Sequence, residues 1–308
     1  MSGNLIEVFA RKIIAMRLMQ MLINEKYKNK EFEIPIHLAL GHEAIALAVS
    51  EAMSADDRLV CSHRNIHYNI ARGATLAQLL AEYLLKPEGL AGGRQGSMNL
   101  TNPERGIPYT SSILGNNFGV GLGVALAMKQ KANGAVTFIV TGDGAMEEGS
   151  FYETLLMFAA QQLSGLIIIE NNGWSLGSCI EERRAAIDVK SLAQGTGASY
   201  ARLSGNNAME YAATLRELRN NARDAKQAIV VEVMLNTLGD WRLKTDEYPD
   251  GKFINYHAGP APTVAVSDWP LIQDDDYDPL TVLCRSLPED RLKQMAIEIK
   301  AALLEGAN

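Results

Sequence analysis

The sequence predicts an α/β fold, with a doubly wound parallel sheet and helices on both of its faces. Four short, mainly apolar runs are expected to be strands, at 135–141, 166–170, 200–203 and 228–235. Helical patterns separate these runs, at 149–162, 188–195 and 207–226. Strands that alternate with helices, and that are apolar along their length, are typical of a parallel sheet covered on both sides.

Helical patterns also occur before and after this region. They lie at 4–27, 41–53, 75–85 and 288–305, and Thr75 is a plausible N-cap of the third. Residues 236–262 show no periodicity and contain several glycines and prolines, and a loop of this length in a compact domain is usually functional or mobile. We therefore expect a single domain over 1–308, with an N-terminal helical extension at 1–35 and an irregular loop at 236–262.

Composition limits the class of function. The chain has 308 residues, 47% of them hydrophobic, a formal net charge of -7 and a pI near 5.4. An acidic chain does not offer the basic face that general nucleic-acid binding requires. The longest purely aliphatic stretch, 166–169, is too short to span a membrane, and charged residues near the N-terminus interrupt any apolar leader. We expect a cytoplasmic protein that binds neither nucleic acid nor membrane.

A glycine-rich turn directly follows the first predicted strand. Gly142, Asp143, Gly144 and Ala145 stand at the carboxyl end of the strand, where open α/β sheets bind ligands. Glycines let the backbone approach a phosphate closely, and the N-terminus of the next helix turns amide groups toward it. By itself the triplet would equally suit a tight turn between a strand and a helix.

The second predicted strand also ends in polar residues, and Asn172 lies just beyond it. Because the carboxyl ends of parallel strands meet at one edge of the sheet, we expect Asp143 and Asn172 to lie side by side. A carboxylate and an amide oxygen, with diphosphate oxygens and water, make a suitable octahedral shell for Mg²⁺. The metal would neutralise the diphosphate, so a net acidic protein can hold an anionic cofactor.

These motifs resemble a known family. The sequence GDGAMEEGSFYE at 142–153, followed by ENNGWSLG at 170–177, is similar to the alpha subunit of the first component of 2-oxo acid dehydrogenases. That group includes the pyruvate, branched-chain and acetoin dehydrogenases. The resemblance runs from about residue 10 to residue 235 and includes GHEA at 41–44 and GSM at 96–98. It implies the thiamine-diphosphate-binding fold, and thiamine diphosphate with Mg²⁺ as cofactors.

The resemblance also implies roles for particular residues. Asp143 and Asn172 would be Mg²⁺ ligands, with the backbone carbonyl of Trp174 as a third. Other contacts with the cofactor would come from His63, Arg64, Ile113, Gly115, Gly142, Gly144 and Ala145. Among these, Arg64 would contact the phosphates, because its planar guanidinium matches phosphate oxygens.

Departures from the family concern the histidines. The family usually reads R-x-H-G after a Tyr-Arg pair, whereas this chain has His63-Arg64 and places His67 one position later. Residues 236–262 lack the family's H-S-x-x-D segment, so no catalytic histidine can be aligned there. His63 and His67 are the catalytic candidates, with His257 a weaker one, although most histidines in a globular chain have no catalytic role.

The resemblance implies that the pyrimidine-binding module is a separate beta subunit, with two alpha and two beta chains in the assembly. The expected activity is decarboxylation of a 2-oxo acid, with transfer of the acyl unit to a lipoyl acyltransferase. The altered segment 236–262 keeps open a second activity, a carboligase that transfers a two-carbon unit to an aldehyde or ketone. Intact Asp143, Gly144 and Asn172 argue against a non-catalytic homologue.

Overall fold

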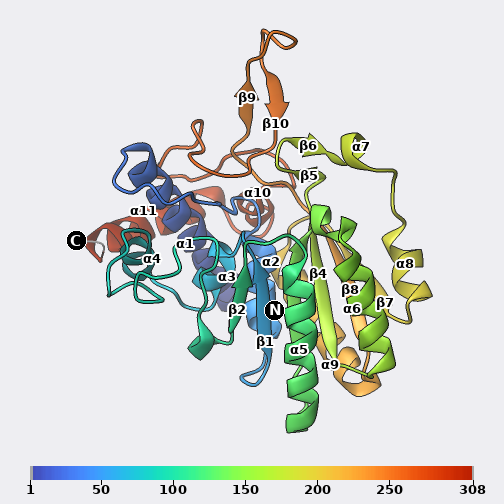
Figure 1. Ribbon diagram of the computed structural model, residues 1–308. Coiled ribbons are helices and arrows are strands. Elements are labelled where there is room, and N and C mark those ends of the chain that lie inside the picture. Colours follow the sequence, from blue (N-terminus) through green and yellow to red (C-terminus); the bar gives the residue numbers. More distant parts are fainter. Residues whose placement is uncertain (1–2, 307–308) are drawn as a thin grey trace.

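A six-stranded sheet forms the centre of the computed structural model, which describes residues 3–306 (Figure 1). The strand order is β2-β1-β3-β4-β8-β7, and all neighbours pair in parallel. The strands are β1 (Arg58–Ser62), β2 (Tyr109–Ser111), β3 (Thr137–Gly142), β4 (Gly165–Asn171), β7 (Ser199–Leu203) and β8 (Ala228–Met234). The predicted α/β class is confirmed, as are all four predicted strands.

Helices cover both faces of this sheet. Alternate side chains of a strand point to opposite faces, so Phe138 and Val140 of β3 join one core while Ile139 joins the other. The first core is covered mainly by α2 (Glu43–Ala52) and α9 (Ala208–Ala225), and the second by α5 (Asn116–Lys131), α6 (Gly149–Ala160) and α8 (Val189–Gly195). The doubly wound arrangement is therefore confirmed.

The remaining helices surround the sheet and its carboxyl edge. They are α1 (Gly3–Lys28), α3 (Ile66–Ala71), α4 (Leu76–Tyr83), α7 (Ile180–Arg183), α10 (Pro279–Leu283) and α11 (Glu289–Glu305), with 3-10 turns η1 (Pro103–Arg105) and η2 (Asp143–Glu147). Thr75 caps α4 as predicted, because its hydroxyl accepts from the Gln78 amide and the Gln78 side chain accepts from the Thr75 amide. No helix within 3–306 is long and apolar enough to cross a membrane.

The expectation of an irregular loop at 236–262 is wrong in part. The strands β9 (Trp241–Leu243) and β10 (Lys252–Ile254) pair antiparallel and form a hairpin that projects from the body in Figure 1. Below it lie β5 (Trp174–Ser175) and β6 (Ser178–Cys179), a second small hairpin. Each strand of the projecting hairpin has only three residues, too few to show an alternating pattern.

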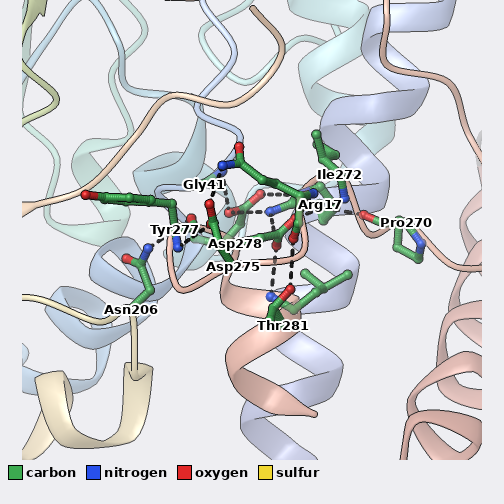
Figure 2. Close-up of polar contacts among 12 residues, drawn as sticks. Arg17, Gly41, Asn206, Pro270, Ile272, Asp275, Tyr277, Asp278 and Thr281 are labelled. Atoms are coloured by element: carbon green, nitrogen blue, oxygen red, sulfur yellow. Dashed lines mark hydrogen bonds and ion pairs between the residues drawn. The ribbon is translucent and has the colours of Figure 1, made fainter. Parts of the chain in front are cut away.

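A buried cluster of charges joins the two ends of the chain (Figure 2). Arg17 of α1 has no solvent exposure, and its guanidinium bonds to Glu43 Oε1 at 2.6 Å and to Asp278 Oδ1 at 3.0 Å. Both carboxylates accept further bonds from backbone amides, Glu43 from Gly41 and Asp278 from Leu280. The cluster fixes α1, the start of α2 and the start of α10 against one another.

Helix α5 packs so closely on β3 that Gly121 has no room for a side chain. An added Cβ would lie 2.5 Å from Ile139 Cγ1 in the closed core. We expect Gly121→Ala to lower the free energy of unfolding by about 1–3 kcal/mol, the usual cost of overpacking. Urea denaturation measures this, with Gly123→Ala as the matched control. A Cβ at Gly123 meets nothing within 4 Å, so that change should stabilise the helix by about 0.5–1 kcal/mol. Equal effects of the two changes would contradict the packing argument.

Candidate functional site

A cavity opens at the carboxyl edge of the sheet, above β1, β3 and β4. It encloses about 680 Å³ of space, including solvent at its mouth. Gly142 lies opposite Glu170 in the parallel register, so the turns after β3 and β4 meet there. Predicted site residues that line the cavity are His63, Arg64, Ile113, Gly115, Gly142, Gly144, Ala145, Asn172 and Trp174.

Asp143 lies beneath the cavity at the start of η2, with no solvent exposure. Its Oδ2 accepts from Arg183 Nη2 at 2.7 Å, whereas Oδ1 is buried without a hydrogen-bond partner among the described residues. Burial raises the pKa of this carboxyl, although Arg183 acts in the opposite direction. A buried carboxylate oxygen with no partner is suited to a hard cation.

Asn172 is held in one orientation by two neighbours. Its Nδ2 donates to Thr237 Oγ1 at 2.8 Å, and its Oδ1 accepts from the backbone amide of Trp174 at 3.0 Å. Together with Asp143, it supplies oxygen donors from the ends of two adjacent strands. The residues present therefore fit a divalent ion of the magnesium type.

Three glycines form part of the cavity wall, where no side chain covers the backbone. Gly115 has a φ of +73°, and a Cβ there would lie 2.8 Å from the Glu148 side chain. A Cβ on Gly144 would lie 2.6 Å from Ser175 Oγ. Gly142 has nothing within 4 Å of an added Cβ, so its backbone faces open space that a phosphate group can enter.

Arg64 lines the cavity, but its guanidinium is already engaged. It donates to the backbone carbonyls of Leu38 and His257, and burial lowers its pKa. It brings positive charge to this wall. To bind phosphate oxygens as predicted, the Arg64 guanidinium would have to move, or donate to the phosphate and to these carbonyls together.

Three histidines face one another beside Arg64. Ring centroids of His37 and His63 are 4.9 Å apart, and that of His257 lies 5.4 and 5.3 Å from them. Burial lowers the pKa of His37 to about 3 and that of His257 to about 4, and the Arg64 charge acts in the same direction. Burial also lowers the pKa of His63 well below its ordinary value. These imidazoles are therefore neutral at physiological pH.

His67 does not line the cavity. It has no solvent exposure, and its Nε2 lies 3.0 Å from Glu170 Oε1, which also accepts from the Tyr68 hydroxyl at 2.8 Å. Burial opposes ionisation of Glu170, but His67 and His42 hold its pKa below the ordinary value. The position of His67 gives no support to the direct catalytic role that the sequence suggested, because Glu170 and the strand end separate it from the cavity.

Several residues of the site carry no role in the sequence reasoning. They are His37, His42, Glu170, Arg183, Thr237 and Tyr256. Glu170 offered a signal, since a carboxylate at the end of an aliphatic strand and next to an Asn-Asn pair needs a buried partner. The others offered little, because their partners are distant in the sequence.

Solved structures that resemble this fold are transketolases. A transketolase from Pichia stipitis in complex with xylulose 5-phosphate matches with a TM-score of 0.61 and 16% identity, over 97% of this chain and 45% of that chain. The transketolase of Campylobacter jejuni matches with a TM-score of 0.60 and 15% identity, over 97% and 48% of the two chains. At these identities the likeness shows the fold alone.

The sequence comparison is more specific. The family model described as the dehydrogenase E1 component matches residues 11–238, and the chain belongs to that family. Pyruvate dehydrogenase E1 component subunit alpha of Solanum tuberosum is 33% identical over 178 residues, 58% of this chain and 45% of that protein. A second relative is the alpha subunit of the acetoin:2,6-dichlorophenolindophenol oxidoreductase of Bacillus subtilis, 28% identical over 65% of this chain and 60% of that protein.

The matched segment spans about half the length of these curated relatives. Membership in the family implies a requirement for thiamine diphosphate. It agrees with the resemblance that the sequence motifs predicted.

Proposed function

We propose that this chain is the alpha subunit of a thiamine-diphosphate-dependent enzyme that decarboxylates a 2-oxo acid and transfers the resulting acyl unit. The observation that carries the proposal is the family match over residues 11–238, which includes Asn172 of the cavity wall and the buried Asp143 beneath it. The curated relatives are subunits of pyruvate and acetoin oxidoreductases, and this supports the dehydrogenase type.

In this proposal, Mg²⁺ is held by Asp143, Asn172 and the backbone carbonyl of Trp174. When bound, thiamine diphosphate supplies the electron sink for decarboxylation. The open backbone at Gly142 and the turn at Gly144 leave space for its diphosphate, and Arg64 adds positive charge beside it. Neutral imidazoles such as His63 can exchange a proton or a hydrogen bond with substrate at the cavity wall.

The same proposal requires a partner chain. Apolar side chains at the mouth of the cavity are exposed, with 69% of Ile113, 51% of Leu114 and 65% of Leu176 accessible. On α5, Gly119 and Gly123 have open space where a Cβ would stand, so another backbone can approach closely. These features support a beta subunit that covers the cavity. We propose that the assembly has two alpha and two beta chains and is cytoplasmic. A lipoyl acyltransferase would receive the acyl unit.

One observation favours a second activity, the carboligase. His37, His63 and His257 form a group of neutral imidazoles beside the cavity, two of them in its wall. Such groups donate and accept hydrogen bonds, which suits the hydroxyl and carbonyl oxygens of an aldehyde or ketone acceptor. The projecting hairpin lies within 236–262, the segment that lacks the H-S-x-x-D pattern expected from the resemblance to the dehydrogenases.

Co-purification with the product of the adjacent gene, followed by turnover of pyruvate as probe, tests these proposals. We expect the assembled enzyme to decarboxylate pyruvate and to acetylate a lipoyl domain at a comparable rate, and this chain alone to be inactive. A hydroxyketone product that forms only with an added aldehyde, and no reaction with the lipoyl domain, would replace the first proposal by the second. Full turnover by this chain alone would refute the need for a beta subunit.

A further inference from the structure

Thr237 links the predicted metal ligand Asn172 to a buried polar chain. Thr237 Oγ1 accepts from Asn172 Nδ2 at 2.8 Å and lies 2.8 Å from His42 Nε2. On the other side of the imidazole, His42 Nδ1 lies 3.3 Å from Glu170 Oε2. Thr237, His42 and Glu170 are all buried, so water does not compete for these positions.

The direction of the bond between Asn172 and Thr237 is fixed, because an amide nitrogen can only donate. A hydroxyl has one proton and can accept two bonds, so Thr237 Oγ1 can bond to His42 Nε2 at the same time, in either tautomer of the imidazole. His42 Nδ1 lies within ion-pair range of Glu170 Oε2 but makes no hydrogen bond of good geometry among the described residues. His67 and Tyr68 fix Glu170 by bonding to its other oxygen, Oε1. The orientation of the Asn172 amide is therefore defined by two bonds, one from its nitrogen to Thr237 and one to its oxygen from the Trp174 amide.

The backbone around Thr237 is also held firmly. The amide of Leu238 donates to the carbonyl of Leu40 at 2.8 Å, next to Gly41. Gly41 has a φ of +92°, and a Cβ there would overlap the carbonyl oxygen of Asn236. These backbone contacts hold the Thr237 side chain in a fixed position beside Asn172.

We propose that Thr237 is a positioning residue, which holds the Asn172 amide with its nitrogen inward so that its oxygen is available to the metal. His42 Nε2 contacts the same hydroxyl at 2.8 Å. An asparagine amide rotated by half a turn would present N–H groups, which cannot bind a cation. This inference rests on the proposed function, because it assigns Thr237 to the magnesium site.

The test is a titration of Mg²⁺ at fixed thiamine diphosphate on the assembled enzyme, followed by calorimetry. Thr237→Val keeps the shape and removes the hydroxyl, and we expect it to weaken magnesium-dependent binding by about 10–100-fold, as for other groups that orient metal ligands. Thr237→Ser restores the hydroxyl and should stay within about threefold of the unaltered enzyme. Thr137→Val is the matched control, because that buried hydroxyl stands at the far end of β3 and has no partner among the described residues.

A double substitution separates positioning from general damage. In an Asn172→Ala background, Thr237→Val should have little further effect, because the group that it orients is gone. An equal loss in both backgrounds, or unaltered binding in Thr237→Val, would overturn the inference alone. Absence of magnesium-dependent binding in the unaltered enzyme would overturn the proposed function, and this inference with it.

Discussion

Replacement of Asp143 by alanine is expected to abolish magnesium-dependent binding of thiamine diphosphate, by at least roughly 1000-fold or about 4 kcal/mol. The carboxylate is fully buried, and its Oδ1 has no other partner in the described part of the chain. Without it the metal loses its only anionic protein ligand in the proposed set, and the diphosphate loses its bridge to the protein. Calorimetry of the assembled enzyme, with Mg²⁺ and cofactor added together, measures the change.

Asp224→Ala is the control for the loss of one negative charge. Asp224 is exposed near the end of α9, which precedes β8 and so lies at the amino edge of the sheet, away from the cavity. Its replacement should leave cofactor affinity unchanged. If Asp143→Ala bound the cofactor as tightly as this control, the assignment of the magnesium site would have to be abandoned.

Replacement of Arg17 by methionine is expected to give a large loss of stability, about 3–5 kcal/mol in the free energy of unfolding. Methionine keeps the length of the side chain but leaves Glu43 and Asp278 as two buried carboxylates without a counter-ion. Chemical denaturation in urea, followed by circular dichroism, measures the loss.

Two further variants test whether unpaired buried charge causes the loss of stability in Arg17→Met. Arg11→Met removes an exposed pair with Glu298 and should cost less than about 1 kcal/mol. Adding Glu43→Gln and Asp278→Asn to Arg17→Met removes the uncompensated charges and should recover a substantial part of the stability. If the triple variant were no more stable than Arg17→Met alone, unpaired charge would not be the source of the loss.

The sequence predicted the part of the fold that depends on local pattern. Strands β3, β4 and β8 are long and buried on both faces, so their apolar runs are visible in the sequence. Strand β1 begins with Arg58 and β2 has only three residues, so neither shows a clear pattern, and both were missed. The hairpin β9–β10 was missed for the same reason.

The residues of the candidate site also fall into two groups, those that local pattern predicts and those that only the folded chain brings together. Asp143 and Asn172 were predicted because each directly follows a strand, and parallel strands bring their ends to one edge. Thr237 and His42 are 195 residues apart, and only the folded chain shows that they meet. The burial of His67 could not be predicted, because it depends on contacts that a single sequence does not reveal.

The cluster around Arg17 has a consequence for synthesis of the protein. Arg17 and Asp278 are separated by 261 positions, which a ribosome adding about 5–20 residues per second needs roughly 13–52 s to cover. During that interval α1 and the start of α2 already exist, but half of the anionic partners of the guanidinium do not. The buried ion-pair cluster around Arg17 is therefore completed only after α10 has been synthesised.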